Sequence, residues 1–405
     1  MSLGTRVSNP SPELVAVFEQ RYNLCMVFYC LKRDDRDAEG GSKFDVFDSA
    51  WLCEMFADLL GVPPYILMTS LIGHSEILFT MKVYEERLYS SSFDGTIKVW
   101  NCKDGNLIKS LESFGLPVRF IVFYMDYMYS CCYDGSIKVW SLTDDYTLMK
   151  TVNGNASIFS AIIENGILYT GTVSGVINAF DCRDNNWRKL KTLDGHSDGV
   201  SSLKFYDGKL YSGSNDNTVK VWDSDDDYKL VITLEGHVNG TKSLAISKFG
   251  KIYSLSTELK VWNCSDYTPV SCTPIVPVAA VAARTDKFIN LTIYGDKLLV
   301  GLNSGDIAVL KCEDDSLLTI LKGHTQPVIT VDIYDDERLF TVSKNHELKV
   351  WDVSGEDYHL LYDSQDDEVQ MGQTSSLGFT WCLDYCKDRL YVARTDHSIS
   401  VLKLS

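Results

Sequence analysis

The stretch RLYSSSFDGTIKVW, residues 87–100, decides the fold because close copies of it recur along the chain. The copies YMYSCCYDGSIKVW, KLYSGSNDNTVKVW and RLFTVSKNHELKVW end at Trp140, Trp222 and Trp351. In each copy, short runs rich in Val, Ile, Tyr and Leu flank turn residues such as Asp-Gly or Asp-Asn, which predicts strand, tight turn and strand. The repetition therefore indicates an all-β fold built from one unit.

Four weaker copies end at Phe180, Trp262, Leu310 and Leu402, which makes eight copies in total. The ends of successive copies are separated by 40, 40, 42, 40, 48, 41 and 51 residues. This period fits four short strands and their turns per unit, and the strand and turn composition of each copy excludes a helical solenoid. A Gly-His pair stands 25 to 27 residues before the closing Trp in four copies, with its histidine at His74, His196, His237 and His324.

Together, the closing KVW and the Gly-His pair resemble the WD-repeat β-propeller family, and the repeats are similar to those of F-box/WD and TRAF-type propellers. The resemblance covers residues 65–405 and implies a ring of eight blades, or seven if repeat six or eight forms no blade. The last repeat stops just after its third strand, so we expect residues 65–71 to supply the outer strand of the eighth blade. Closure of the ring would leave no blade face unprotected.

The resemblance also implies a hydrogen-bonded network in each complete repeat, made by the His, a Ser or Thr, the turn Asp and the Trp. Two repeats have every member of this network: His74, Ser90, Asp94, Trp100 and His196, Ser212, Asp216, Trp222. The seventh repeat has Asn345 at the Asp position, and the fifth has lost two turn residues together with the Asp.

The resemblance further implies that one residue per repeat lies on the face that holds the loops before the innermost strands. These candidate partner-binding residues are Phe79, Arg119, Phe159, Ser201, Lys242, Ile289, Ile329 and Trp381. Aromatic and arginine side chains are typical of interface hot spots, and Arg pairs well with carboxylate or phosphate groups. The ring therefore suits an acidic or phosphorylated peptide with apolar neighbours, unless its side chains simply plug the channel.

Two other sets of residues recur with the repeat. Tyrosines at one position predict packing between blades: Tyr89, Tyr129, Tyr169, Tyr211, Tyr253 and Tyr391. Cysteines two residues after the blade-closing residue indicate a structural position: Cys102, Cys182, Cys264 and Cys312.

Residues 1–64 do not repeat and predict a small α+β segment. Residues 24–31 and 44–47 are expected to form strands, and residues 48–60 an amphipathic helix that stops at Gly61 and Pro63-Pro64. This order resembles the first half of a ubiquitin-like β-grasp fold. The segment is either a cap that packs on the propeller or a recruitment module of ubiquitin-like or F-box-like type.

The formal charge of -17 argues against nucleic acid as a partner, and no run of 18 apolar residues predicts membrane insertion. The carboxylates gather in loops expected on the opposite face, which should be acidic. The twelve cysteines are spread along a chain whose first residues lack a signal-peptide core, so free thiols in the cytoplasm, or alternatively the nucleus, are expected.

No metal-binding spacing, phosphate-binding glycine loop or nucleophile elbow occurs, so we expect no catalytic residues, no cofactor and no metal. The sequence predicts a non-catalytic scaffold that binds proteins or peptides, itself monomeric within a larger assembly. The alternative is the substrate receptor of a ubiquitin ligase, in which Arg119 and Lys242 receive a phosphorylated or acidic peptide. A propeller enzyme, the third class, would need polar groups that converge in the channel.

Overall fold

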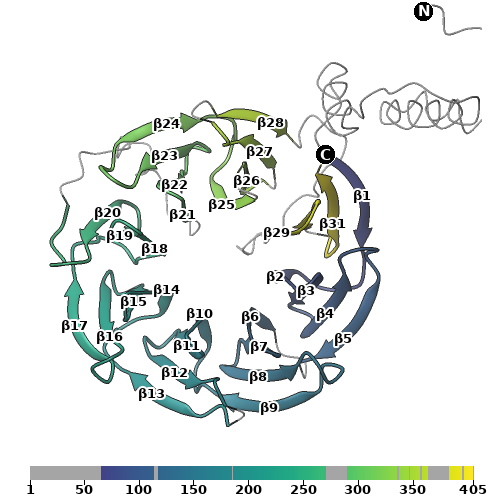
Figure 1. Cartoon of the computed structure of the whole chain (residues 1–405), viewed down its shortest axis with the longest axis horizontal. Helices are drawn as coiled ribbons and strands as arrows, with labels where there is room; N and C mark the ends of the chain where they lie inside the picture. The colour runs from purple at the N-terminus through teal and green to yellow at the C-terminus, as the bar shows by residue number, and fades with distance from the viewer. Residues whose placement is uncertain are drawn as a thin grey trace, which may run out of the picture. The chain divides into compact units, whose positions relative to one another are not determined.

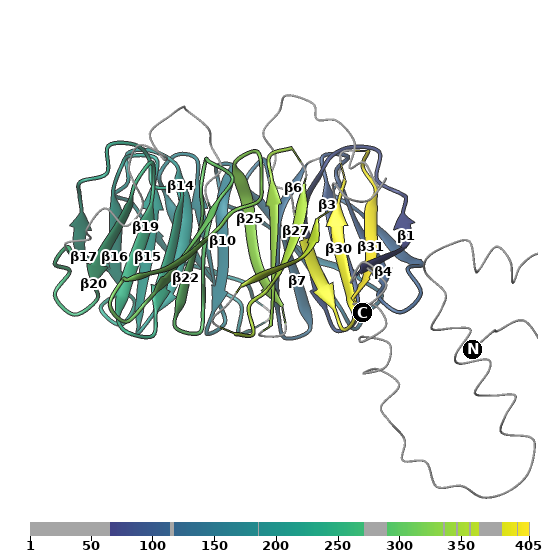
Figure 2. The same ribbon diagram turned by 90° about the horizontal axis from the view of Figure 1, so that it is seen from above.

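The computed structural model describes residues 65–113, 117–184, 186–270, 290–334, 337–345, 347–355, 358–363, 383–394 and 396–404. These residues form eight antiparallel β-sheets. The sheets stand as blades around a central channel, and the first strand of each blade is innermost (Figure 1). In Figure 2 the strands run between the two faces of the ring. The predictions of an all-β propeller and of eight blades rather than seven are confirmed.

The first four blades each contain four strands in chain order, from the channel outwards. Blade 1 contains β2 (Leu78–Tyr84), β3 (Arg87–Ser92), β4 (Thr96–Asn101) and β5 (Leu107–Glu112), and blade 2 contains β6 (Val118–Tyr124), β7 (Tyr127–Cys132), β8 (Ser136–Ser141) and β9 (Leu148–Asn153). Blade 3 contains β10 (Ile158–Glu164), β11 (Ile167–Thr172), β12 (Ile177–Asp181) and β13 (Lys189–Leu193), and blade 4 contains β14 (Val200–Tyr206), β15 (Lys209–Ser214), β16 (Val219–Asp223) and β17 (Lys229–Leu234).

The remaining blades follow the same order, with two departures. Blade 5 contains β18 (Ser243–Ser247), β19 (Lys251–Leu255) and β20 (Leu259–Asn263), blade 6 contains β21 (Leu291–Tyr294), β22 (Lys297–Gly301), β23 (Ile307–Lys311) and β24 (Leu317–Leu321), and blade 7 contains β25 (Val328–Tyr334), β26 (Arg338–Ser343), β27 (Leu348–Asp352) and β28 (His359–Asp363). In blade 5 the described outer edge is a single bridge between Trp262 and Pro269.

Blade 8 joins the two ends of the propeller. Its inner strands are β29 (Leu383–Cys386), β30 (Arg389–Ala393) and β31 (Ile399–Leu404), and its outer strand is β1 (Tyr65–Leu71). The expected role of residues 65–71 is therefore confirmed. The hydroxyl of Tyr391 also donates a hydrogen bond to the carbonyl oxygen of Cys102 in blade 1, at 3.1 Å. The ring thus closes through contacts between residues almost 300 positions apart.

Turn residues explain where the hairpins bend. Gly95 has a φ of 76° in the turn after β3, a conformation that glycine adopts without steric cost. At the matching place in blade 4, Asn217 has a φ of 73°. Asparagine is one of the few other residues that tolerate this left-handed region. The Asp-Gly and Asp-Asn pairs in the sequence therefore predict the turns correctly.

The core lies between neighbouring blades. Tyr89 of blade 1 is 1% exposed and packs in one cluster with Ile121, Met128 and Trp140 of blade 2. The other five recurring tyrosines are equally buried, which confirms their predicted packing role. The described cysteines are free thiols, and those at the recurring position are buried or half-buried. Burial raises the pKa of Cys182 to about 11, so this thiol is an unreactive packing group.

Several expectations lie outside the described residues. They are the strands, helix and domain role predicted for residues 1–64, and the candidate binding residues Ile289 and Trp381.

Candidate protein-interaction face

The histidine network in blade 1 fixes the loops at one face of the ring. The two nitrogens of His74 each lie 2.8 Å from a partner, Nδ1 from Asp94 Oδ2 and Nε2 from Ser90 Oγ. The indole N–H of Trp100 donates to the same Ser90 oxygen at 2.9 Å. These contacts are consistent with Nδ1–H donating to Asp94 and the Ser90 hydroxyl donating to Nε2. The loop before the innermost strand is thereby joined to the turn between the second and third strands.

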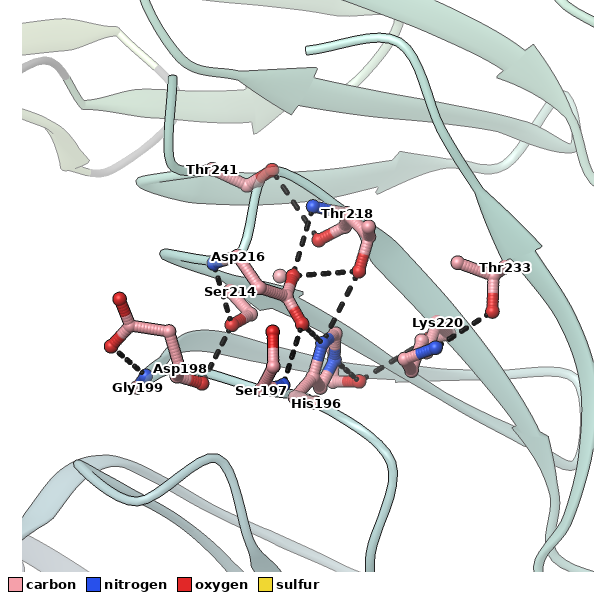
Figure 3. Close-up of polar contacts among 12 residues, drawn as sticks. His196, Ser197, Asp198, Gly199, Ser214, Asp216, Thr218, Lys220, Thr233 and Thr241 are labelled. Atoms are coloured by element: carbon pink, nitrogen blue, oxygen red, sulfur yellow. Dashed lines mark hydrogen bonds and ion pairs between the residues drawn. The ribbon is translucent and has the colours of Figure 1, made fainter. Parts of the chain in front are cut away.

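Blade 4 repeats this geometry around His196, whose contacts with Asp216 and Ser212 are also 2.8 Å (Figure 3). Trp222 donates to Ser212 at 2.9 Å. Burial lowers the pKa of His196, which favours the neutral ring. Burial would raise the pKa of Asp216, but hydrogen bonds from Thr218 and His196 outweigh it and keep that pKa below its ordinary value. The pair is therefore a neutral imidazole held by a carboxylate.

Blades 5 and 7 supply the carboxylate from a different position, which sequence reasoning missed. Glu258 Oε1 lies 3.5 Å from His237 Nδ1, and Glu347 Oε2 lies 3.2 Å from His324 Nδ1. Both glutamates stand where the complete repeats have the threonines Thr96 and Thr218. The signal was present in the sequence, since both imperfect copies read ELKVW where the complete ones read TIKVW and TVKVW.

The predicted ring residues occupy one structural position in five blades. The pairing between the first two strands skips Phe79, Arg119, Phe159, Ser201 and Ile329, each of which stands at a register shift. A β-bulge re-aims the side chain of the residue that the pairing skips. The bulges therefore explain why one residue per blade leaves the regular alternation of the innermost strand.

Arg119 is the ring residue whose charged group lies against aromatic rings. Its guanidinium carbon lies 4.7 Å from the ring centroid of Phe159 and 6.0 Å from that of Tyr133. Its Nη1 donates a long hydrogen bond, of 3.5 Å, to the carbonyl oxygen of Ile158. Desolvation by burial lowers its pKa, and no carboxylate in the described part of the chain forms an ion pair with it. The cation is thus held between aromatic rings with its hydrogen-bonding capacity largely unused.

Exposed apolar side chains continue this site across blades 1 to 3. Phe93, Tyr133 and Val173 occupy the same position after the second strand of their blades and are 43%, 53% and 42% exposed. Phe93 also stacks on Phe79, with ring centroids 5.1 Å apart. We use the name aromatic arc for the six residues Phe79, Phe93, Arg119, Tyr133, Phe159 and Val173. The corresponding positions in blades 6 and 7 are polar, since they hold Asn303 and Lys344.

The remaining described ring residues are engaged within the propeller. Ser201 Oγ donates to the carbonyl oxygens of Gly213 and Thr241. Lys242 Nζ donates to Asn215 Oδ1 at 2.8 Å, and Ile329 is 5% exposed. Lys242 precedes β18 of blade 5, so blades 3 and 4 separate it from Arg119 in blade 2. The two cations do not flank one another.

On the opposite face, several acidic turns hold blades together. Lys109 in the outer strand of blade 1 lies 2.6 Å from Asp145 in a turn of blade 2, and Lys191 of blade 3 pairs in the same way with Asp227 of blade 4. Among the described residues there is no metal-binding group of His, Cys, Asp or Glu. Over the same residues, no helix is long and apolar enough to cross a membrane.

Comparison with known proteins agrees with this architecture. The family model described as "WD domain, G-beta repeat" matches residues 66–101, 112–141, 187–223 and 315–352. Zinc finger CCCH domain-containing protein 62 of Arabidopsis thaliana is 28% identical over 177 residues, which covers 42% of each chain. Ribosome biogenesis protein WDR12 homolog of Anopheles gambiae is 29% identical over 185 residues, which covers 39% of this chain and 42% of the relative.

The chain spans less than half the length of the first curated relatives it matches. The crystal structure of the computationally designed Ika8 protein aligns with a TM-score of 0.70 at 22% identity, over 83% of this chain and 99% of Ika8. This likeness concerns the fold alone. The four matched repeats and the eight-bladed ring together show that this chain belongs to the WD-repeat β-propeller family.

Proposed function

We propose that this protein is a non-catalytic scaffold that binds other proteins through the aromatic arc on blades 1 to 3. The observation that carries the proposal is the setting of Arg119, a desolvated cation whose guanidinium carbon lies 4.7 Å from the half-buried ring of Phe159 and 6.0 Å from the exposed ring of Tyr133. Arg, Tyr and Trp are enriched among the few residues that dominate the binding energy of protein interfaces. One relative, similar over part of its length, is named a ribosome biogenesis protein, and this name is compatible with a scaffold that functions within a multi-protein assembly.

Quantitative affinity purification from native cells tests this proposal. Tagged wild-type chain is compared with the double variant Phe93→Ala/Tyr133→Ala and with Met149→Ala, a matched control for an exposed apolar residue on the outer strand β9. We expect the double variant to lose specific partners that the control retains. Identical partner sets for all three proteins would contradict the proposal.

A second candidate function is recognition of an acidic or phosphorylated peptide, as a substrate receptor of a ubiquitin ligase would require. The guanidinium of Arg119, which forms no ion pair with the residues that the structure describes, supports it, because a partly buried cation gains most from a charge-assisted pair. Since Lys242 lies three blades further round the ring, Arg119 alone would hold the anionic group.

A phosphopeptide library tests the second candidate. Binding of enriched peptides should weaken at least about tenfold in Arg119→Ala, the loss of one charge-assisted hydrogen bond. Arg188→Ala is the matched control, since its side chain is 67% exposed and its Nη2 lies 3.9 Å from Asp181 Oδ2 on the opposite face. Equal peptide enrichment by wild type and Arg119→Ala would reject this candidate. The scaffold proposal would still be tested by the affinity purification described above.

A further inference from the structure

Four charged residues occupy one level of the central channel, away from the aromatic arc. Lys82, Lys204, Asp332 and Asp384 lie on the innermost strands of blades 1, 4, 7 and 8, and each pairs in register with the recurring aromatic residue of its second strand: Tyr89, Tyr211, Phe340 and Tyr391. At this level the other blades contribute Val122, Ile162, Ala245 and Thr292. The charges therefore share one height in the ring.

The acidic side of this level lies on the adjacent blades 7 and 8. Asp384 accepts hydrogen bonds from the amides of Val83 at 2.7 Å and Tyr385 at 2.9 Å, which fix its carboxylate. Asp332 accepts a hydrogen bond from the amide of Ile333 at 2.9 Å. Burial raises the pKa of both carboxyl groups. A nearby cation would stabilise their charged forms.

Lys82 supplies only part of the positive charge that would balance Asp332 and Asp384. Its amine lies 3.9 Å from Asp384 Oδ2 and its side chain is 55% exposed, so water reaches this level of the channel. One amine beside two carboxylates leaves the acidic side with an excess of negative charge. A second cation, brought by a ligand, would balance it.

Lys204 stands on the other side of the channel, because blade 4 is opposite blade 8 in a ring of eight (Figure 1). In the part of the chain that the structure describes, no hydrogen bond or ion pair is recorded for its amine. Its side chain is exposed to the channel, and partial desolvation together with repulsion from Lys82 lowers its pKa. The amine would gain from an anionic partner, while its flanking blades offer Ile162 and Ala245 at the same level.

We propose that this level of the channel binds a small dipolar ligand of the amino-acid type. An ammonium or guanidinium group of the ligand pairs with Asp332 and Asp384, and a carboxylate pairs with Lys204. Such a ligand stabilises charges of opposite sign on opposite walls at once, which neither a simple cation nor a simple anion does. The site is separate from the aromatic arc and holds whether or not the arc binds proteins.

Isothermal titration of the full chain with L-arginine tests the proposal, with methylguanidinium and acetate as probes of single charge. Wild type should bind L-arginine at least about tenfold more tightly than either single-charge probe. Asp332→Asn and Lys204→Gln should each weaken L-arginine binding by about tenfold, while Asp226→Asn, a carboxylate that is 68% exposed on the opposite face, should not.

The single-charge probes distinguish a loss of one charge contact from a general structural effect, which would weaken the binding of both probes. Asp332→Asn should lose methylguanidinium binding and keep acetate binding, and Lys204→Gln should do the reverse. Thermal unfolding of each variant verifies that it is folded. Equal affinities for the three probes in wild type, or L-arginine affinities that do not change in either variant, would overturn the proposal.

Discussion

Glu347 Oε2 lies 3.2 Å from His324 Nδ1 in blade 7, where it takes the place that Asp94 has beside His74 in blade 1. The same glutamate lies 2.7 Å from Lys349, and both side chains are 2% exposed. The turn position that holds aspartate in the complete repeats is Asn345 here. A carboxylate from the residue just before β27 thus replaces one from the turn position.

Replacement of this glutamate should destabilise the propeller, and restoring the turn aspartate should reverse much of the loss. We expect Glu347→Thr to lower the free energy of unfolding by about 3 kcal/mol, because His324 and Lys349 lose a buried partner. The double variant Asn345→Asp/Glu347→Thr recreates the arrangement of blade 1 and should recover about half of that loss. Urea unfolding measures the free energy of both variants. A double variant that is no more stable than Glu347→Thr would refute the claim that Glu347 replaces the turn aspartate.

The shared hydroxyl in blade 1 should matter more than its counterpart in blade 2. Ser90 Oγ contacts both His74 and Trp100, whereas Ser130 Oγ accepts a bond from Trp140 in a repeat without a Gly-His pair. Ser90→Ala should therefore cost about 2–3 kcal/mol and Ser130→Ala about 1 kcal/mol. Chemical denaturation of the two variants checks this order, and equal losses would show that the His74 bond contributes no stability.

Acidification should destabilise blade 5 through His237. Desolvation, only partly offset by Glu258, lowers the pKa of His237 from 6.5 to about 4. The unfolded chain then binds a proton before the folded chain does, so this stability is complete above pH 6.5 and is lost as the pH falls towards 4.

At pH 5 the loss should amount to about 2 kcal/mol. Unfolding free energies at pH 7 and pH 5 measure it in wild type and in His237→Gln, whose difference between the two pH values should be smaller by that amount. An unchanged difference would mean that His237 does not resist protonation.

The recurring tyrosines should differ in what their hydroxyls contribute. Tyr253 donates to Asp315 Oδ1 at 2.8 Å across the boundary between blades 5 and 6, whereas the buried Tyr129 hydroxyl has no hydrogen-bond partner among the described residues. Tyr253→Phe should cost about 1–2 kcal/mol and Tyr129→Phe should be neutral or slightly stabilising. Thermal unfolding separates the two, and the reverse order would contradict this account of the blade boundaries.

The sequence predicts the ring well because blades are local units. Turn residues such as Gly95 and Asn217 and the closing Trp residues fix each hairpin from its own neighbours. Even the closure by residues 65–71 follows from counting strands, since the last repeat lacks an outer one.

The site was predicted less fully because its contacts join different repeats. The position of Arg119 follows from the family pattern, but its placement between Phe159 of blade 3 and the Tyr133 turn depends on how blades stack. The sequence likewise grouped Arg119 with Lys242, although blades 3 and 4 lie between them. Glu347 was missed because its longer side chain, from the residue just before β27, performs the role that was sought at the turn position of Asn345.

The central claim, that the aromatic arc binds partner proteins, is tested most directly by the affinity of a captured partner for single variants. For a partner purified with the wild-type chain, Tyr133→Ala should raise the dissociation constant at least about tenfold, as expected for an interface hot spot. Met149→Ala, of similar exposure on the outer strand β9, should leave it unchanged. Equal dissociation constants for wild type and Tyr133→Ala, or a loss confined to Met149→Ala, would contradict the claim.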